Sequence, residues 1–391
     1  MFKALTNAYI NGQRQQTLIM DDEMITWVGH DADARLQECE SIEDCQARLV
    51  TAGLIDCHTH LIYGGKRFDE YEARLNGSSY EDIARQGGGI LSTVKATRAC
   101  TEQKLFESAS KRLLHLISDG VTAVEIKSGY GLDLETELKM LKVAAKLEQV
   151  LGLKISKTFL GAHTIPPEYI DNRQDYVDLI CATILPEIKP HADACDVFCE
   201  SFAFTLEESK KILQAAKELG LNLKAHAEQL SATGAAAMAS EMGALSVEHL
   251  EYMDEASVKI LADSNTVAVL LPGAFYTLKE TKKPPIDLFR KYHVPIAIAS
   301  DSNPGSSPVL SLRLMMNMAC QFFGLTPEES LKAVSINAAQ ALGFNDLGKL
   351  QKGYKANIAV WDAESVAELC GTLGGSLLNK SYSYSRLLFE S

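Results

Sequence analysis

Strand-like and helix-like segments alternate through the middle of the chain, and this alternation restricts the fold more than any other feature. Segments with helical apolar spacing separate eight strand candidates. The helical segments are residues 102–118, 134–151, 206–219 and 256–262. The strand candidates are residues 55–60, 122–127, 155–161, 196–200, 223–226, 245–249, 266–271 and 296–301. Eight such units predict a closed (β/α)8 barrel of the TIM type, with its active site at the carboxyl ends of the strands.

A doubly wound open sheet is the alternative fold for the same pattern. The glycines at 87–89 do not form the Gly-x-Gly-x-x-Gly fingerprint after a strand that dinucleotide-binding sheets of this kind carry. We therefore expect them to form a loop near the active site.

Both ends of the chain have the pattern of short antiparallel strands. Residues 8–10, 17–20 and 24–29 are strand candidates, with an Asn11-Gly12 hairpin turn after the first, and residues 353–362 have the pattern of a turn followed by a strand. Neither end is long enough to form a sheet layer alone. They predict one small β-sandwich domain built from residues 1–51 and 348–391, beside a barrel of residues 52–347. The segment from Cys370 onwards has no pattern that we can place.

Charge and cysteine content narrow the class of protein. The 391 residues carry a net charge of −13, which argues against nucleic acid and anionic membranes as partners but allows a small anionic substrate. The nine cysteines include no Cys-x-x-Cys pair, the N-terminus lacks the apolar core of a signal peptide, and no apolar run approaches the ~20 residues of a membrane span. A cytoplasmic location is expected. The sequence does not set the oligomeric state, and a homodimer is compatible with it.

Two histidines stand at the end of the first barrel strand. Side chains two residues apart on a strand point the same way, so His58 and His60 project together. They can form half of a tetrahedral or five-coordinate metal site. A His-x-His pair alone is a weak signal, because two histidines satisfied by hydrogen bonds give the same pattern.

Further polar residues follow the other strands. His226 ends the fifth strand, His249 the sixth and Asp301 the eighth, and His163 follows the third by a few residues. In a barrel these ends meet at one rim, which makes a metal site a far better interpretation than incidental core histidines.

This constellation resembles the amidohydrolase superfamily. The resemblance implies that His58, His60, His226 and Asp301 bind the metal. Many members with two ions place a carboxylated lysine at the end of the fourth strand, where this chain has Glu200. One Zn²⁺ or Fe ion per chain is therefore expected. Glu200 is a weak candidate for a second site and a better one for a structural or substrate-side carboxylate.

Longer motifs resemble the imidazolonepropionase family of histidine degradation. They are residues 64–67, 86–94, 125–132, 161–169 and 300–307. The resemblance implies hydrolysis of 4-imidazolone-5-propanoate to N-formimidoyl-L-glutamate by a metal-activated water. Asp301 would take the proton of the water, and His249 would orient it or stabilise the oxyanion.

The resemblance also implies a set of substrate-binding residues. Arg67 would bind the propanoate, and Gln229 would bind the ring without acting as a base, since an amide is a poor proton shuttle. The remaining members of the set are Tyr80, Tyr130, His163, Asn303, Gly305 and Ser306. Some have simpler explanations: Arg67 as a surface ion pair, Tyr80 as a core residue, and Gly305 as part of a turn.

Two other functions remain open on the sequence. A deaminase or another ring amidohydrolase would use the same ligands. A catalytically silent relative could serve as a binding or scaffold protein, but such relatives usually lose metal ligands and none is missing here.

Overall fold

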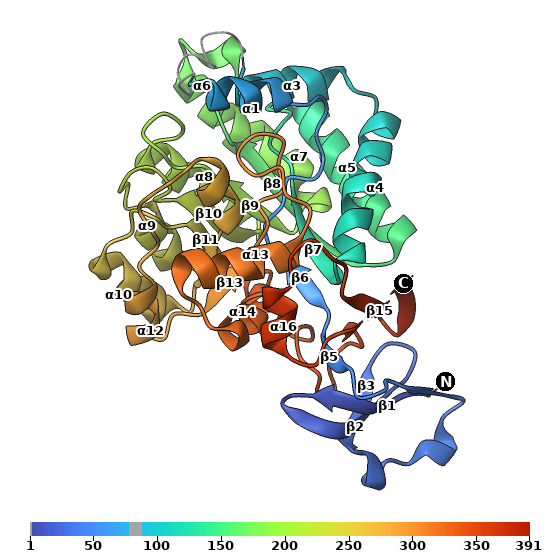
Figure 1. Cartoon of the computed structure of the whole chain (residues 1–391). Helices are drawn as coiled ribbons and strands as arrows, with labels where there is room; N and C mark the ends of the chain where they lie inside the picture. The colour runs from blue at the N-terminus through green and yellow to red at the C-terminus, as the bar shows by residue number, and fades with distance from the viewer. Residues whose placement is uncertain (1, 78–87) are drawn as a thin grey trace.

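Eight parallel strands form a barrel at the centre of the computed structural model, which describes residues 2–77 and 88–391 (Figure 1). They are β6 (Leu54–Asp56), β7 (Val121–Lys127), β8 (Lys154–Ala162), β9 (Ala194–Val197), β10 (Asn222–Ala227), β11 (Ser246–His249), β12 (Val267–Leu270) and β13 (Ile296–Ile298). Each strand pairs with the next one in the sequence. The amide of His60 donates to the carbonyl of Ser302 (2.9 Å), and that of Asp301 donates to the carbonyl of His58 (3.0 Å). These bonds join the first and last strands, so the predicted (β/α)8 barrel is confirmed over the open sheet.

Helices surround the barrel. They are α1 (Phe68–Leu75), α3 (Ile90–Ala99), α4 (Glu102–Ser118), α5 (Leu134–Leu151), α6 (Arg173–Leu179), α7 (Leu185–Ile188), α8 (Leu206–Glu218), α9 (Ala235–Glu241), α10 (Glu255–Ser264), α11 (Pro272–Thr277), α12 (Ile286–Lys291), α13 (Leu312–Met318), α14 (Pro327–Ala333) and α15 (Ile336–Ala341). The helices expected from apolar spacing are confirmed as α4, α5, α8 and α10. The hydroxyl of Thr101 caps α4, and Leu105, Ala109 and Leu113 bury one face of it.

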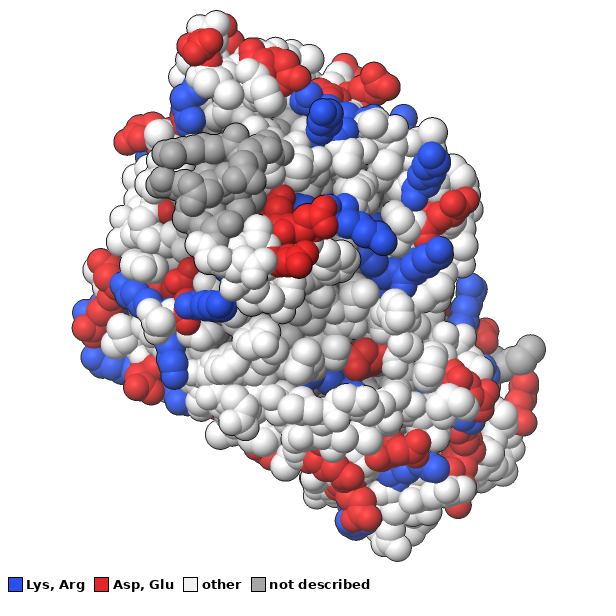
Figure 2. All heavy atoms as spheres, turned by 45° about the horizontal axis from the view of Figure 1, so that its top comes forward, with Lys and Arg blue, Asp and Glu red and all other residues white. Residues whose placement is uncertain are grey.

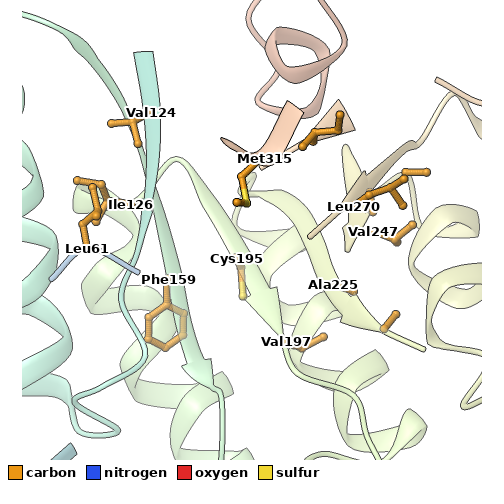
Figure 3. Close-up of a cluster of buried hydrophobic side chains, with 14 of the residues drawn as sticks. Leu61, Val124, Ile126, Phe159, Cys195, Val197, Ala225, Val247, Leu270 and Met315 are labelled. Atoms are coloured by element: carbon orange, nitrogen blue, oxygen red, sulfur yellow. The ribbon is translucent and has the colours of Figure 1, made fainter. Parts of the chain in front are cut away.

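Successive side chains of the barrel strands face opposite ways, and the two faces differ in polarity. Val124 and Ile126 of β7 belong to the same apolar cluster as Leu141 of α5, and Figure 3 shows them among side chains from the other strands. Glu125 and Lys127 alternate with them and form ion pairs inside the barrel. The wall of the barrel is therefore apolar, whereas its interior carries charge.

The two ends of the chain form a second sheet, as predicted. Its order is β16-β15-β14-β5-β1-β2-β3, with β4 paired to β1. The strands are β1 (Lys3–Ile10), β2 (Gln13–Met20), β3 (Ile25–His30), β4 (Ser41–Asp44), β5 (Leu49–Ala52), β14 (Ile358–Trp361), β15 (Leu378–Ser383) and β16 (Arg386–Glu390). Leu18 of β2 and Val360 of β14 share one core, so the two halves of the sheet pack together. The exact domain boundaries at residues 51 and 348 stay a prediction.

The segment beyond Cys370, which the sequence did not place, extends this sheet. Helix α16 (Val366–Gly371) leads into β15 and β16, which pair as an antiparallel hairpin. Both chain termini consequently lie at the same end of the molecule (Figure 1).

The lengths of the helices and the charges on one face of the molecule bear on the partners that the sequence argued against. Each helix among the described residues is too short or too polar to cross a bilayer. On the face in Figure 2, acidic and basic side chains lie interspersed. The absence of nucleic acid as a partner stays a prediction from the net charge of −13.

Candidate metal centre

The four predicted metal ligands meet above the carboxyl end of the barrel. The Nε2 atoms of His58 and His60 are 3.2 Å apart, and Oδ1 of Asp301 lies 3.4 Å from each of them. The ring of His226 is centred 4.5 Å from that of His58. All four side chains are buried. The structure therefore brings together residues that are up to 243 positions apart, one within β10 and the others just after β6 and β13.

The donor set fits a divalent metal ion. Nδ1 of His58 lies 2.6 Å from Oε2 of Glu248, and Nδ1 of His226 lies 3.0 Å from Oδ2 of Asp196. A carboxylate beside Nδ1 holds the ring proton on that nitrogen, so the lone pair of Nε2 is free to bind a metal ion. Facing lone pairs beside a carboxylate need a cation between them, and three imidazoles with one carboxylate suit Zn²⁺ or Fe.

The pKa values of these imidazoles follow from burial and from the neighbouring charges. Burial disfavours the charged form of His58, but the carboxylates of Glu248 and Asp301 together outweigh it and raise the pKa to about 9. Burial and the nearby charge of His58 hold the pKa of His60 well below its usual range. In the absence of a bound ion, these neighbours favour a proton on His58 and disfavour one on His60.

The backbone at the strand ends is unusual. Asp301 (φ 50°), His249 (φ 79°) and Glu228 (φ 52°) adopt the left-handed conformation that non-glycine residues rarely adopt. Such positions concentrate at functional sites, where the surrounding structure holds them. At His249 the turn directs the ring to within 5.5 Å of the ring of His226, centre to centre.

A buried ion network that we did not predict lies directly beneath the ligands. Its members are Glu125, Lys127, Asp196, Lys224 and Glu248, each no more than 1% exposed. Asp196 and Glu248 are the carboxylates that face His226 and His58. The available signal was the i, i+2 spacing of charged residues inside otherwise apolar strands, as at Glu125 and Lys127.

Tyr130 and His163 lie beside the ligands, on the loops after β7 and β8. The ring of His163 stacks on that of His60 (5.4 Å, 19°), and the ring of Tyr130 lies 5.3 Å from His163. Nδ1 of His163 contacts the carbonyl oxygen of Gly129 at 3.0 Å. Burial and the nearby His226 lower the pKa of His163 to about 3, so this ring is neutral.

Arg67 is buried, with 9% exposure, and is not a surface residue. Its Nε and Nη2 donate to Oε2 of Glu70 (2.9 and 2.7 Å), and Oε1 of Glu70 accepts from the amide of Gly89. A Cβ at Gly305 would lie 2.2 Å from Nη1 of Arg67. Glycine is therefore required at 305 for the close approach of the guanidinium, a stronger reason than the turn alone.

The remaining predicted residues have different surroundings. Asn303 accepts from the amides of Gly305 and Ser306 (both 2.8 Å) and donates to the carbonyl of Asp301 (2.7 Å), so it shapes the loop after β13. Gln229 is buried just after β10. Tyr80 lies outside the described residues.

Glu200 has a structural position. Its Oε1 accepts from the amides of Leu230 (2.8 Å) and Ser231 (3.1 Å), and its Oε2 accepts from the hydroxyl of Ser231 (2.5 Å). These bonds hold the turn that follows the strand of His226. Of the roles considered for Glu200, which were a second metal site, a substrate-side carboxylate and a structural carboxylate, these bonds favour the structural one.

Comparison with known proteins places the chain among enzymes of one family. The model of the amidohydrolase family matches residues 49–382. Imidazolonepropionase from Hahella chejuensis is 55% identical over 338 residues, covering 86% of this chain and 84% of that protein. Imidazolonepropionase from Shewanella baltica is 52% identical over 378 residues, covering 95% and 91%.

Solved structures share the fold at much lower identity. A 5-methylcytosine deaminase from Klebsiella pneumoniae has a TM-score of 0.79 at 16% identity, covering 99% of this chain and 97% of that one. An adenosine deaminase from Xanthomonas campestris with bound zinc has a TM-score of 0.72 at 14% identity, covering 99% and 92%. At such identities the likeness concerns the fold alone.

Proposed function

The chain belongs to the amidohydrolase family and, within it, to the imidazolonepropionases, and on this premise we propose how its residues perform the reaction. The reaction is hydrolysis of a cyclic amide C–N bond in 4-imidazolone-5-propanoate, which yields N-formimidoyl-L-glutamate in histidine degradation. The oxygen of water enters the new carboxylate, and the released ring nitrogen takes up a proton.

The family uses a metal cofactor, and we assign this chain one Zn²⁺ or Fe ion held by His58, His60, His226 and Asp301. The chemistry that such an ion would supply there is a lower pKa of bound water, towards neutrality, and polarisation of the ring carbonyl. The assignment of a single ion draws support from Glu200, whose oxygens are taken up by Leu230 and Ser231.

Two side chains handle the protons in this proposal. The carboxylate of Asp301, through the oxygen other than the metal-facing Oδ1, takes the proton of the attacking water and passes it to the released ring nitrogen. Burial and the nearby His226 hold the pKa of His249 well below its usual range, so the ring is neutral and can donate one hydrogen bond to the developing oxyanion.

The substrate is bound by its carboxylate arm and by the edge of its ring. The guanidinium of Arg67, held by Glu70, offers its remaining N–H groups to the propanoate. Neutral Tyr130 and His163 line the ring, and Gln229 binds it through the amide. Asn303, Gly305 and Ser306 shape the loop beside it, and Tyr80 completes the predicted set.

The proposal rests on one observation. The Nε2 atoms of His58 and His60 and Oδ1 of Asp301 lie 3.2–3.4 Å apart, in a chain more than 50% identical to imidazolonepropionases. The test is an assay of purified protein with 4-imidazolone-5-propanoate, and with cytosine, guanine and adenine in parallel. Formimidoylglutamate is expected, without ammonia from the nucleobases. His58→Ala should lose both metal and activity, whereas His191→Ala, a half-exposed histidine outside the site, should keep both.

Release of ammonia from a nucleobase, with imidazolonepropanoate left intact, would favour the deaminase alternative. A protein that binds imidazolonepropanoate without turnover would favour the silent relative.

We also propose a cytoplasmic location, which nine unpaired cysteines support. A homodimer remains a prediction that size-exclusion chromatography with light scattering can decide.

A further inference from the structure

An ammonium group occupies a cage of three carboxylates beneath the metal ligands. Nζ of Lys127 lies 2.7 Å from Oδ2 of Asp196, 2.9 Å from Oε2 of Glu125 and 3.1 Å from Oε2 of Glu248. All four side chains are fully buried. A charge in such a place persists only when it is paired, and here each carboxylate has Lys127 as a common partner.

Two of these carboxylates also contact the metal ligands from below. Oε2 of Glu248 lies 2.6 Å from Nδ1 of His58, and Oδ2 of Asp196 lies 3.0 Å from Nδ1 of His226. The same two oxygen atoms that contact Lys127 therefore contact the imidazoles. The position of the ammonium fixes the carboxylates, and the carboxylates fix the tautomer and tilt of the rings.

The cage would otherwise suit a second metal ion. His58, Glu125 and Glu248 have ligand atoms within 4.8 Å of one another, and so do Asp196, His226 and Glu248. Lys127 has the charge of a cation and stands among these atoms. Lys224, at 2.7 Å from Oε1 of Glu125 and 3.0 Å from Oε1 of Glu248, is a second positive charge on the same acids.

We propose that Lys127 serves as a built-in second cation, which positions Glu248 and Asp196 on the metal-ligating histidines and keeps the centre at one ion. The inference rests on the proposed function for the identity of the metal ligands. The residues of the network make no contact with the substrate or the reacting atoms. Glu248, Asp196 and Lys127 act on the reaction only through His58 and His226.

The first test is Glu248→Gln, which keeps the shape of the side chain and removes its charge. Zn²⁺ affinity, measured by competition with a chromophoric chelator, should fall about 10–100-fold, the usual effect of losing such a partner. The absorption spectrum of the Co²⁺-loaded protein should also change, because the ligand field at His58 changes. A purely structural role would leave that spectrum as it is.

A matched control is Asp119→Asn, which alters a partly buried carboxylate of this chain. Asp119 pairs with Arg313 (3.0 Å) at the junction of α4 and β7, outside the network. Its variant should lower the melting temperature and leave Zn²⁺ affinity unchanged. Unchanged affinity and an unchanged Co²⁺ spectrum in Glu248→Gln would overturn the inference. The proposed function would then still stand, provided that wild type binds one ion and hydrolyses the substrate.

The second test is Lys127→Ala, which empties the cage. Elemental analysis of this variant after dialysis against Zn²⁺ should give two ions per chain, and the double variant Lys127→Ala with Glu248→Gln should return to one. A single ion in Lys127→Ala with unaltered affinity would contradict the proposal. Should Lys127→Ala fail to fold, the affinity and spectrum of Glu248→Gln decide the question alone.

Discussion

Two buried glutamates, three residues apart, differ in charge at neutral pH: Glu248 is ionised and Glu251 is protonated. Glu248 is the penultimate residue of β11, and Glu251 follows the same strand; both are at most 2% exposed. Burial disfavours the charge of each. At Glu248, however, His58, Lys127 and Lys224 hold the pKa well below its usual range. At Glu251 burial, together with the carboxylates of Glu280, Asp301 and Glu200, raises the pKa to about 8.

The difference between the two acids shows that burial alone does not set charge in this barrel. Neither Oε2 atom has a hydrogen-bond partner among the described residues, but Oε2 of Glu248 forms ion pairs with Nζ of Lys127 (3.1 Å) and Nδ1 of His58 (2.6 Å). Cations placed on inward positions of β7 and β10 keep the layer beneath the metal ionised. Glu251, at the start of the following loop, forms no ion pair with a cation among the described residues, and its pKa of about 8 keeps the carboxyl protonated at neutral pH.

The largest expected effect comes from removing a cation from Glu248. Lys224→Met leaves Glu125 and Glu248 with one ammonium fewer in a site that water does not reach. The free energy of unfolding should fall by about 3–5 kcal/mol, the usual cost of breaking a buried ion pair from one side. Urea unfolding with a chelator present measures this loss separately from metal binding.

The matched control for that variant is Lys210→Met, on the exposed face of α8. It should change the free energy of unfolding by less than about 0.5 kcal/mol, as most surface substitutions do. Equal losses in the two variants would show that the buried acids do not depend on Lys224 for their charge.

The next effect concerns the pH dependence of stability at Glu251. A carboxyl with a pKa of about 8 in the folded protein and 4.5 in the unfolded chain binds its proton more tightly when folded. Its contribution to stability is therefore complete below about pH 4.5 and is lost as the pH rises to 8. At about 1.4 kcal/mol per pKa unit, the loss is on the order of a few kcal/mol.

Glu251→Gln removes that titration. The variant should gain stability relative to wild type between pH 5 and pH 9, by the few kcal/mol that wild type loses over this range. Urea unfolding at the two pH values measures the gain. The difference between the two pH values is independent of any packing change that the amide introduces. A constant difference from wild type at both values would mean that Glu251 is ionised when buried.

The terminal sheet shows which parts of the fold can be predicted from sequence. Both of its two-residue hairpins need left-handed backbone: Asn11 and Gly12 have φ 50° and 80°, and Tyr384 and Ser385 have φ 52° and 62°. Asn-Gly adopts this conformation with little strain, so the first turn was predictable. Tyr-Ser adopts it only because β15 and β16 pair around it, and that pairing is a tertiary effect without a local signal.

The candidate site, too, contains residues that could be predicted from the sequence and residues that could not. His58, His60, His226 and Asp301 could be assembled because the carboxyl ends of parallel strands meet at one rim. The network of Lys127 and its acids was missed because charged residues in a strand are also common on exposed edges. Which face points inward depends on packing against helices. The contact of Arg67 with Gly305 joins loops 238 residues apart and has no counterpart in any local pattern.

The smallest expected effect comes from changing an acidic neighbour of Glu251. After burial itself, Glu280 is the largest of the influences that raise the pKa of this carboxyl. Glu280 is partly exposed, so its charge acts through a solvent-screened path and is worth no more than about 1 kcal/mol. Glu280→Gln should shift the upper midpoint of the pH dependence of stability to lower pH by less than about one unit.

Unfolding free energies at closely spaced pH values between 6 and 9 would resolve this shift. Glu255→Gln is the matched control, because Glu255 is an exposed acid on α10 that pairs with Lys291 and is not among the groups that act on Glu251. A midpoint that stays in place in both variants would mean that burial alone keeps Glu251 protonated. The contrast with Glu248 would then depend on the cations around Glu248 and not on the acids around Glu251.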